Sequence, residues 1–242
     1  MIDEQRSTLS ARLQAVHWDN VTLNLHQNGY AVIDDVLDRD ECLQQIEAYA
    51  AGDTYRKTVV MERYRFGLGE YKYFKYPLPP LVAKLRETVY PHLAAVANKW
   101  MDVLGVDTRY PFSHAGLLEM CHTAGQTQPT PLILKYGQGG FNTLHQDLYG
   151  AIFFPLQLVV ILNKAEEDYC GGEFVLTEQV PRAQSKAIVL RPKQGSILIF
   201  TTNFRPVKGS RGFYRAGMRH GVSPILSGER HTLGVIFHDA QS

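Results

Sequence analysis

A histidine and a carboxylate stand two residues apart near the middle of the chain, as His145 and Asp147. Side chains two residues apart in an extended strand leave the same face, so this imidazole and this carboxylate can bind one cation together. A third ligand must come from elsewhere in the chain, and His220 is the candidate. Two histidines and one carboxylate on one face of a metal ion leave the opposite coordination positions open.

Ten positions after His220 comes Arg230, and Thr232 follows two residues later. The guanidinium group of arginine binds a carboxylate through two parallel hydrogen bonds, so Arg230 is a candidate anchor for an anionic ligand. Because Thr232 leaves the same face of an extended strand as Arg230, its hydroxyl group can join the same site.

In identity and order, these five residues resemble the metal and cosubstrate residues of the Fe(II)/2-oxoglutarate-dependent dioxygenases. The resemblance implies that His145, Asp147 and His220 bind Fe(II), with 2-oxoglutarate and O2 at the open positions. It also implies that Arg230 binds the far carboxylate of 2-oxoglutarate and that Thr232 assists. In this family the reaction hydroxylates a C–H bond and yields succinate and CO2, with ascorbate as a candidate reductant.

The pattern is most similar to the prolyl-hydroxylase-like branch of the family. Tyr136, in the run LILKYGQGG, resembles the tyrosine that reaches the cosubstrate in that branch, and the run HGVSPILSGER carries His220 and Arg230. A tyrosine suits this role because its ring packs in an apolar barrel while its hydroxyl finds a polar partner. An ordinary strand tyrosine is the alternative. The C-terminal run HTLGVIFHDA is similar to a bacterial group of 2-oxoglutarate/Fe(II) oxygenases predicted to act on damaged nucleic acid.

The primary hypothesis is a dioxygenase that hydroxylates a peptide residue, a free amino acid or another small metabolite. Oxidative demethylation of alkylated DNA or RNA, as in AlkB-like enzymes, is the alternative. Those proteins carry a second arginine where this chain has Ile236, which counts against that branch. A third hypothesis is a barrel that binds metal or a small ligand without catalysis, and the intact set of five residues argues against it. A zinc or manganese cupin enzyme would not require Arg230.

Composition favours a soluble globular protein without a general affinity for nucleic acid or membranes. The chain has 242 residues and a net charge of +1, with 45% hydrophobic and 20% charged residues. The three cysteines share no Cys-x-x-Cys spacing, so neither a disulfide framework nor a zinc ribbon is expected. We predict a cytoplasmic protein, because the polar N-terminus lacks a signal peptide and no run approaches the roughly 18 apolar residues of a membrane span. Nothing in the sequence predicts the oligomeric state.

The first half of the chain predicts helices. We expect one helix over residues 8–28, a strand over 30–33, and a helix from Asp38, whose capping box includes Glu41, to about residue 52. Apolar residues three to four apart predict an amphipathic helix over residues 81–104, with a possible interruption at Pro91.

The second half predicts short strands separated by turns. These strands span residues 117–121, 132–135, 151–162, 173–177, 187–190, 196–200 and 232–237. Helices followed by strands indicate an α+β architecture. The family resemblance implies a double-stranded β-helix, or jelly-roll barrel, with the N-terminal helices packed on one face. We predict a single domain over residues 1–242, with residues 1–110 helical in character and the jelly roll over 116–239.

Two segments are rich in cations and leave their roles open. Residues 58–76 interleave aromatic and basic side chains, which predicts either stacking on nucleic-acid bases, a packed strand pair, or a lining of the site mouth. Residues 203–220 hold five Lys or Arg and no acid, which predicts either a basic border of the site or a solvated loop. Gln157 is the polar residue of an otherwise apolar strand, and the histidines outside the metal set are expected to be structural or exposed.

Overall fold

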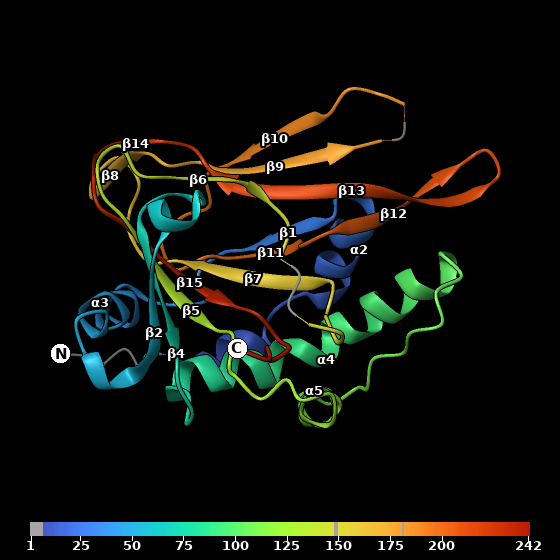
Figure 1. Cartoon of the computed structure of the whole chain (residues 1–242), viewed down its shortest axis with the longest axis horizontal. Coiled ribbons are helices and arrows are strands. Elements are labelled where there is room, and N and C mark those ends of the chain that lie inside the picture. Colours follow the sequence, from blue (N-terminus) through green and yellow to red (C-terminus); the bar gives the residue numbers. More distant parts are fainter. Residues whose placement is uncertain (1–6, 148–149, 181) are drawn as a thin grey trace.

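The computed structural model describes residues 7–147, 150–180 and 182–242. The two residues that follow Asp147 therefore lie outside the described part of the chain. Within the described ranges, the fold is built on two antiparallel sheets that face each other, with helices outside the larger one (Figure 1). This is the predicted α+β jelly roll.

Seven strands form the larger sheet within the described residues, and we call it the major sheet. In spatial order they are β1 (Tyr30–Ile33), β11 (Ile197–Thr201), β7 (Leu156–Ile161), β15 (Arg230–Val235), β5 (Leu132–Tyr136), β4 (Glu70–Phe74) and β2 (Tyr55–Val60). Successive residues of the central strands point alternately into two apolar environments. Leu158 and Val160 of β7 pack toward the helices, whereas Val159 and Ile161 pack toward the second sheet. Burial on both faces explains the nearly continuous apolar run of this strand.

The smaller sheet, called the minor sheet, covers the inner face of the major sheet. In spatial order its strands are β10 (Lys186–Leu190), β9 (Phe174–Gln179), β13 (Gly212–Val222), β6 (Phe141–His145) and β3 (Gly67–Leu68), and β12 (Phe204–Gly209) pairs with β13. A further pair joins β14 (Ile225–Gly228) to β8 (Tyr169–Gly171). Phe174, Leu176 and Met218 fill the space between the two sheets.

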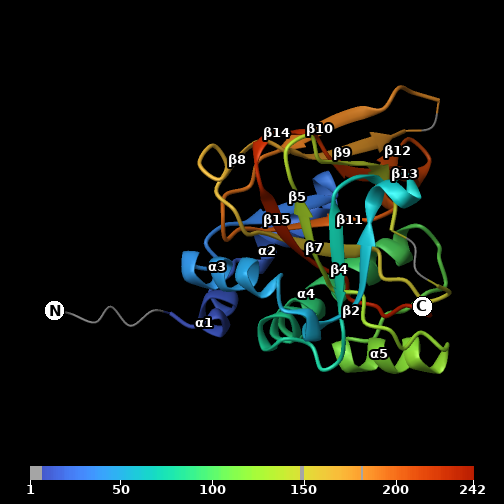
Figure 2. The same ribbon diagram turned by 60° about the vertical axis from the view of Figure 1, so that its left-hand side comes forward.

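Helices cover the outer face of the major sheet (Figure 2). They are α1 (Leu9–Gln14), α2 (Trp18–Asn28), α3 (Arg39–Ala48), α4 (Pro80–Val103) and α5 (His114–Thr123). The predicted capping box begins α3, since the Asp38 side chain accepts from the Glu41 backbone N–H at 2.8 Å. None of the helices in the described ranges is long and apolar enough to cross a membrane.

Two helix predictions need correction. The single helix expected over residues 8–28 is two helices, because α1 ends at Gln14 and α2 begins at Trp18. Pro91 does not interrupt α4, which keeps one continuous buried face from Val82 to Trp100. Burial of that face offsets the hydrogen bond that proline removes from the helix.

The strand expected over residues 117–121 was wrong, because this segment belongs to α5. Leu117 and Cys121 are both buried, and a spacing of four residues places them on one helix face. Ser113 caps the helix by accepting from the Gly116 backbone N–H at 3.2 Å. This cap is the helix signal that the prediction missed.

One strand prediction and one loop prediction also need correction. The strand expected over residues 151–162 begins only at Leu156, directly after Pro155, which cannot donate a ladder hydrogen bond. The basic segment 203–220 is not a loop: most of it forms the β12–β13 hairpin, which turns between Gly209 and Gly212. Gly212 has a φ of +118°, which glycine adopts without the strain that other residues incur.

Candidate metal centre and its cavity

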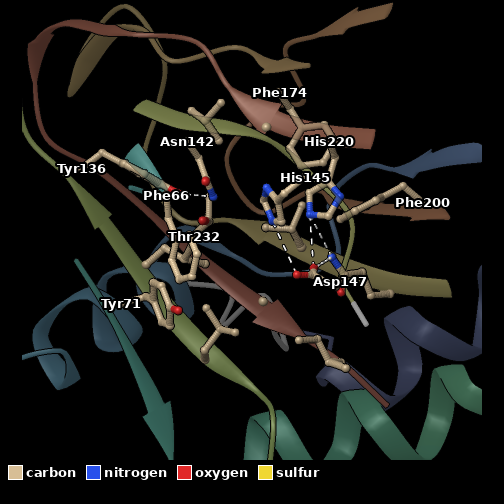
Figure 3. A pocket seen from close by; sticks show the side chains of 18 of the residues that line it. Phe66, Tyr71, Tyr136, Asn142, His145, Asp147, Phe174, Phe200, His220 and Thr232 are labelled. Atoms are coloured by element: carbon tan, nitrogen blue, oxygen red, sulfur yellow. Dashed lines mark hydrogen bonds and ion pairs between the residues drawn. The ribbon is translucent and has the colours of Figure 1, made fainter. Parts of the chain in front are cut away.

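The minor sheet brings the two candidate histidine ligands together. His145 is the last residue of β6 and pairs directly with His220 of β13 in the antiparallel ladder. Asp147 follows the end of β6, and both imidazole rings face its carboxylate (Figure 3). His145 Nε2 is 3.5 Å from Asp147 Oδ1, and His220 Nε2 is 3.3 Å from Asp147 Oδ2. One ligand atom from each residue lies within 4.8 Å of the other two, a spacing that one metal ion can bridge.

The electrostatics of the three side chains suit a cation. Burial would raise the pKa of Asp147, but the neighbouring His220 and His145 outweigh it and hold that pKa well below its usual range. Burial lowers the pKa of His220, and Asp147 offsets only part of this shift. Burial would also lower the pKa of His145, yet hydrogen bonding to Asp147 raises it overall. A carboxylate that stays ionised beside a histidine that favours the neutral form is a suitable donor pair for a divalent metal.

Contacts around the ligands fix their orientation. His145 Nδ1 lies 2.8 Å from the Thr143 carbonyl oxygen, which leaves Nε2 free to face the metal position. The His220 ring packs against Phe174 and Phe200, with centroid distances of 6.0 and 4.7 Å. Partners that hold the second ring nitrogen or the ring plane are typical of metal-binding histidines.

Gln157 of β7 also points at this cluster. Its Nε2 donates to Asp147 Oδ2 at 2.8 Å and lies 3.4 Å from His220 Nε2. The sequence contained the signal, since a lone polar residue in a buried apolar strand needs a polar partner. The spacing motifs did not identify it because its partners come from other strands.

Arg230 lies in the same cavity but has no counterion among the described residues. It is the first residue of β15 and only 2% exposed, and its Nε and Nη1 have no hydrogen-bond partner among the described residues. Its Cζ is 5.9 Å from the ring centroids of both Tyr136 and Tyr169. A buried guanidinium without an anion is unfavourable, so the geometry fits a carboxylate ligand.

Tyr136 and Thr232 line the cavity beside Arg230. Tyr136 of β5 pairs with Arg230 in the ladder, and its hydroxyl accepts from Asn142 Nδ2 at 3.3 Å. Burial raises the pKa of Tyr136 to about 12, so the hydroxyl stays protonated and can donate to a ligand. Thr232 is 2% exposed on the same face of β15 as Arg230, as strand alternation predicts.

The cavity has a volume of about 300 Å³ and runs between the two sheets. Side chains of the predicted aromatic and basic segment contribute to its wall, namely Phe66, Tyr71 and Tyr73. That segment is therefore both a packed strand pair, β2 with β4, and part of the cavity lining. Gly234 forms part of the floor, where it adds no side chain.

The remaining buried histidines lie outside the cluster, as expected. His231 Nδ1 is 3.1 Å from Asn163 Oδ1 on the opposite face of β15. His114 Nε2 lies 2.9 Å from the Phe237 carbonyl oxygen, and His238 Nδ1 accepts from the Phe154 backbone N–H at 3.1 Å.

Comparison with known proteins identifies the family. The model of the Oxygenase-NA family, described as "Oxygenase, catalysing oxidative methylation of damaged DNA", matches residues 69–240. The chain belongs to this family. An uncharacterized protein of Mycobacterium tuberculosis, found in strains CDC 1551 / Oshkosh and ATCC 25618 / H37Rv, is 48% identical over 167 residues. These residues are 69% of this chain and 72% of the relative.

Solved structures share the fold of this Oxygenase-NA member. A prolyl hydroxylase from Trichoplax adhaerens, in complex with a hypoxia inducible factor peptide fragment, has a TM-score of 0.53 and 16% identity, covering 98% of this chain and 96% of that one. A prolyl 4-hydroxylase from Phytophthora capsici has a TM-score of 0.54 and 18% identity, covering 94% of this chain and 64% of that one. The predicted oxygenase class is confirmed by the family model, and the predicted jelly-roll fold is shared with these prolyl hydroxylases. The cluster and Arg230 fit the Fe(II) and the 2-oxoglutarate that the sequence resemblance implies.

Proposed function

We propose that this Oxygenase-NA protein uses Fe(II), 2-oxoglutarate and O2 to oxidise an alkyl group on a base of single-stranded or unpaired nucleic acid. His145, Asp147 and His220 would hold the metal, and Arg230, with Thr232 and Tyr136, would hold the cosubstrate. One observation supports the oxygenase chemistry: three side chains that can ligate a metal share a cavity with a buried guanidinium that has no anionic partner in the described part of the chain.

The bound metal and cosubstrate supply the oxidising power. One atom of O2 enters the substrate C–H bond and the other enters succinate, as 2-oxoglutarate loses CO2. A methyl group on a ring nitrogen would become a hydroxymethyl group, which leaves as formaldehyde and restores the N–H. The protein's own residues orient the ligands and surround the reacting carbon with an apolar wall that excludes water.

The lining of the cavity argues against a free amino acid as substrate. Among the lining residues that the structure describes, only Asp147 and Arg230 carry a formal charge, besides the two histidines. The metal would bind Asp147 and the cosubstrate would bind Arg230, so neither charge would be available to the substrate. A free amino acid would then bury its ammonium and carboxylate groups without partners, which is unfavourable. Aromatic and aliphatic side chains such as Tyr71, Tyr73 and Leu132 instead favour a planar or apolar group.

A basic hairpin outside the cavity favours a polyanion. The strand β13, which carries His220, continues into the hairpin with β12, and this hairpin projects beyond the body of the sheets (Figure 1). Of its cations, Arg205 is paired with Glu178 at 2.6 Å, whereas Lys208 and Arg211 have no ion pair among the described residues. Cations that project from a nearly neutral protein attract phosphates locally. The family description, which names damaged DNA, supports the same substrate class.

A succinate-release assay tests this proposal. The metal-loaded protein receives 2-oxoglutarate, O2 and either methylated single-stranded oligonucleotides, unmodified oligonucleotides, or neutral peptides. We expect succinate and formaldehyde in equal amounts with methylated oligonucleotides, and neither product from the Asp147→Ala variant. Succinate coupled only to peptide oxidation would reject the nucleic-acid substrate while keeping the oxygenase chemistry. Absence of succinate under every condition would reject both.

A further inference from the structure

Two aromatic side chains next to the cavity are exposed to solvent. Tyr64 ends the short 3-10 helix η2 (Met61–Tyr64), and Phe66 follows just before β3. Their ring centroids are 5.5 Å apart and their planes differ by 19°, so the rings are stacked. Tyr64 is 55% exposed and Phe66 is 45% exposed, although Phe66 also lines the cavity. A stacked pair in this position extends the apolar wall of the cavity toward the surface.

The backbone under the two rings is firmly anchored. Met61 is fully buried in a cluster that includes Tyr136. The Phe66 carbonyl oxygen accepts from the Thr143 backbone N–H at 2.9 Å and from Thr143 Oγ1 at 2.8 Å. Thr143 belongs to β6 and lies two residues before His145, so the same strand positions the rings and a candidate metal ligand. The exposure of the rings is therefore built into the fold.

Cations flank the stacked rings. Arg63 and Arg65 are exposed, and neither forms an ion pair within the part of the chain that the structure describes. Arg65 adopts a left-handed backbone conformation, with a φ of +59°, which reverses the chain between the two aromatic residues. The nearest acid, Glu62, accepts from the Gly69 backbone N–H at 3.4 Å. An exposed aromatic face flanked by unpaired arginines matches a planar group attached to a phosphate.

We propose that Tyr64 and Phe66 form a stacking platform for the base that neighbours the oxidised base in a nucleic-acid strand, with Arg63 and Arg65 near the intervening phosphates. This inference rests on the proposed function. It assigns a subsite to the aromatic and basic segment that the cavity chemistry does not require. A cavity of about 300 Å³ accommodates one reacting group beside the cosubstrate, so the next base must be held outside it.

The test compares Tyr64→Leu with Tyr64→Phe on matched oligonucleotides. Tyr64 is suitable because its ring does not line the cavity. Base stacking on an aromatic side chain contributes about 1–3 kcal/mol, so Tyr64→Leu should raise KM for a methylated oligonucleotide by about fivefold or more. Tyr64→Phe should stay close to the wild type. When the neighbouring nucleotide is abasic, wild type and Tyr64→Leu should become equal, because the stacking partner is missing. Phe112→Ala is the control, since Phe112 is 74% exposed in the loop before α5.

The possible outcomes of this test distinguish failure of the stacking platform from failure of the proposed function. Equal KM values for wild type and Tyr64→Leu on the intact oligonucleotide would overturn the platform while leaving the proposed function in place. An equal loss on intact and abasic oligonucleotides would also overturn it, because the effect would not arise from stacking. If the wild type acts on no oligonucleotide and oxidises peptides instead, the proposed substrate fails and the platform fails with it.

Discussion

Two arginines are almost completely buried at different places in the fold, and their surroundings differ sharply. Arg86 of α4 is 1% exposed and donates to Asp239 at 2.9 Å, to the Phe237 carbonyl oxygen at 2.7 Å and to the Tyr76 hydroxyl at 3.1 Å. Arg230 of β15 is 2% exposed and lacks hydrogen-bond partners for two of its nitrogens within the described residues.

This difference indicates that the charge of Arg86 stabilises the fold, whereas the charge of Arg230 suits an anionic ligand. Asp239, the partner of Arg86, also accepts from the Tyr76 hydroxyl at 2.9 Å and lies 3.1 Å from His122 Nε2. This cluster fastens the C-terminal segment to α4. Burying a charge without a partner is costly, so a protein that leaves Arg230 unpaired gains from that position in another way. Anion binding is the compensation that the cavity permits.

The largest effect should come from removing the carboxylate of Asp147, which lines the same cavity as Arg230. Asp147→Ala should lower turnover by about three orders of magnitude or more, because metal-assisted catalysis contributes several kcal/mol. The protein should stay folded, since Asp147 lies beyond the end of β6. Succinate release and circular dichroism measure both quantities. Asp102→Ala, at an exposed aspartate paired with Arg109, is the matched control and should keep full activity. Undiminished turnover of Asp147→Ala would remove this residue from the metal site.

At the other arginine, the effect should be on stability. Arg86→Met should lower the free energy of unfolding by about 3–5 kcal/mol, because it leaves Asp239 buried without its counterion. Urea denaturation measures this loss. The double variant Arg86→Met/Asp239→Asn should recover part of it, since the uncompensated charge is gone. A single variant as stable as the wild type would contradict the structural role.

The Arg86 region should also make stability depend on pH. Burial and, to a smaller extent, the charge of Arg86 lower the pKa of the nearby His114 to about 4. Between pH 6.5 and about 4 the unfolded chain binds a proton that the folded chain does not, so stability is lost as the pH falls through this window. The contribution is at most about 3 kcal/mol. His114→Gln should have a shallower dependence in urea titrations of metal-free protein at pH 7 and 4.5. Parallel curves would contradict this assignment.

Arg230→Met should have the opposite profile to Arg86→Met. Affinity for 2-oxoglutarate should fall by about 1.5–3 kcal/mol, the contribution of a charged hydrogen bond, or roughly ten- to hundredfold. The stability of the ligand-free protein should be unchanged or higher, because an uncompensated buried charge is removed. Isothermal titration and urea denaturation provide the two measurements. Unchanged affinity would exclude Arg230 as the cosubstrate anchor, and a large loss of stability would mean that Arg230 resembles Arg86.

The smallest effect should come from Gln157→Leu. Loss of the hydrogen bond to Asp147 should weaken metal affinity by about tenfold, as expected for a residue that orients a ligand. Competition with a chelator measures this affinity. Gln194→Leu is the control, because Gln194 donates to the Leu162 carbonyl oxygen away from the cavity. Equal affinities in the two variants would show that Gln157 does not orient the metal site.

Sequence spacing predicted the residues that meet in the cavity, because local geometry governs most of them. Arg230 and Thr232 lie two residues apart on β15, so strand alternation aligns them, whereas Asp147 lies two residues after His145 but beyond the end of β6. The pairing of His220 with His145 needed the tertiary register, which only the family resemblance supplied. The roles of these residues in binding iron and cosubstrate remain the predictions given above.

Other features depend on contacts that no local pattern reveals. Gln157 faces the metal cluster only because β7 pairs in a particular register with β11 and β15. The helix α5 was mistaken for a strand because the short apolar run over residues 117–121 does not distinguish a helical period from a strand. Basic residues suggested a loop where β12 and β13 form a hairpin, since pairing compensates for the charge and glycine content of both strands.

Gly234 lines the cavity at a position that has room for a larger side chain. A Cβ atom at this position would meet Leu132 Cγ at 3.5 Å, an ordinary van der Waals distance, and the backbone is not in a left-handed conformation. Larger side chains there would shorten the space available to ligands at little cost to the sheet. Single substitutions at this one position on β15 would therefore change the size of the ligand that the cavity admits, and directed evolution of this scaffold can begin there.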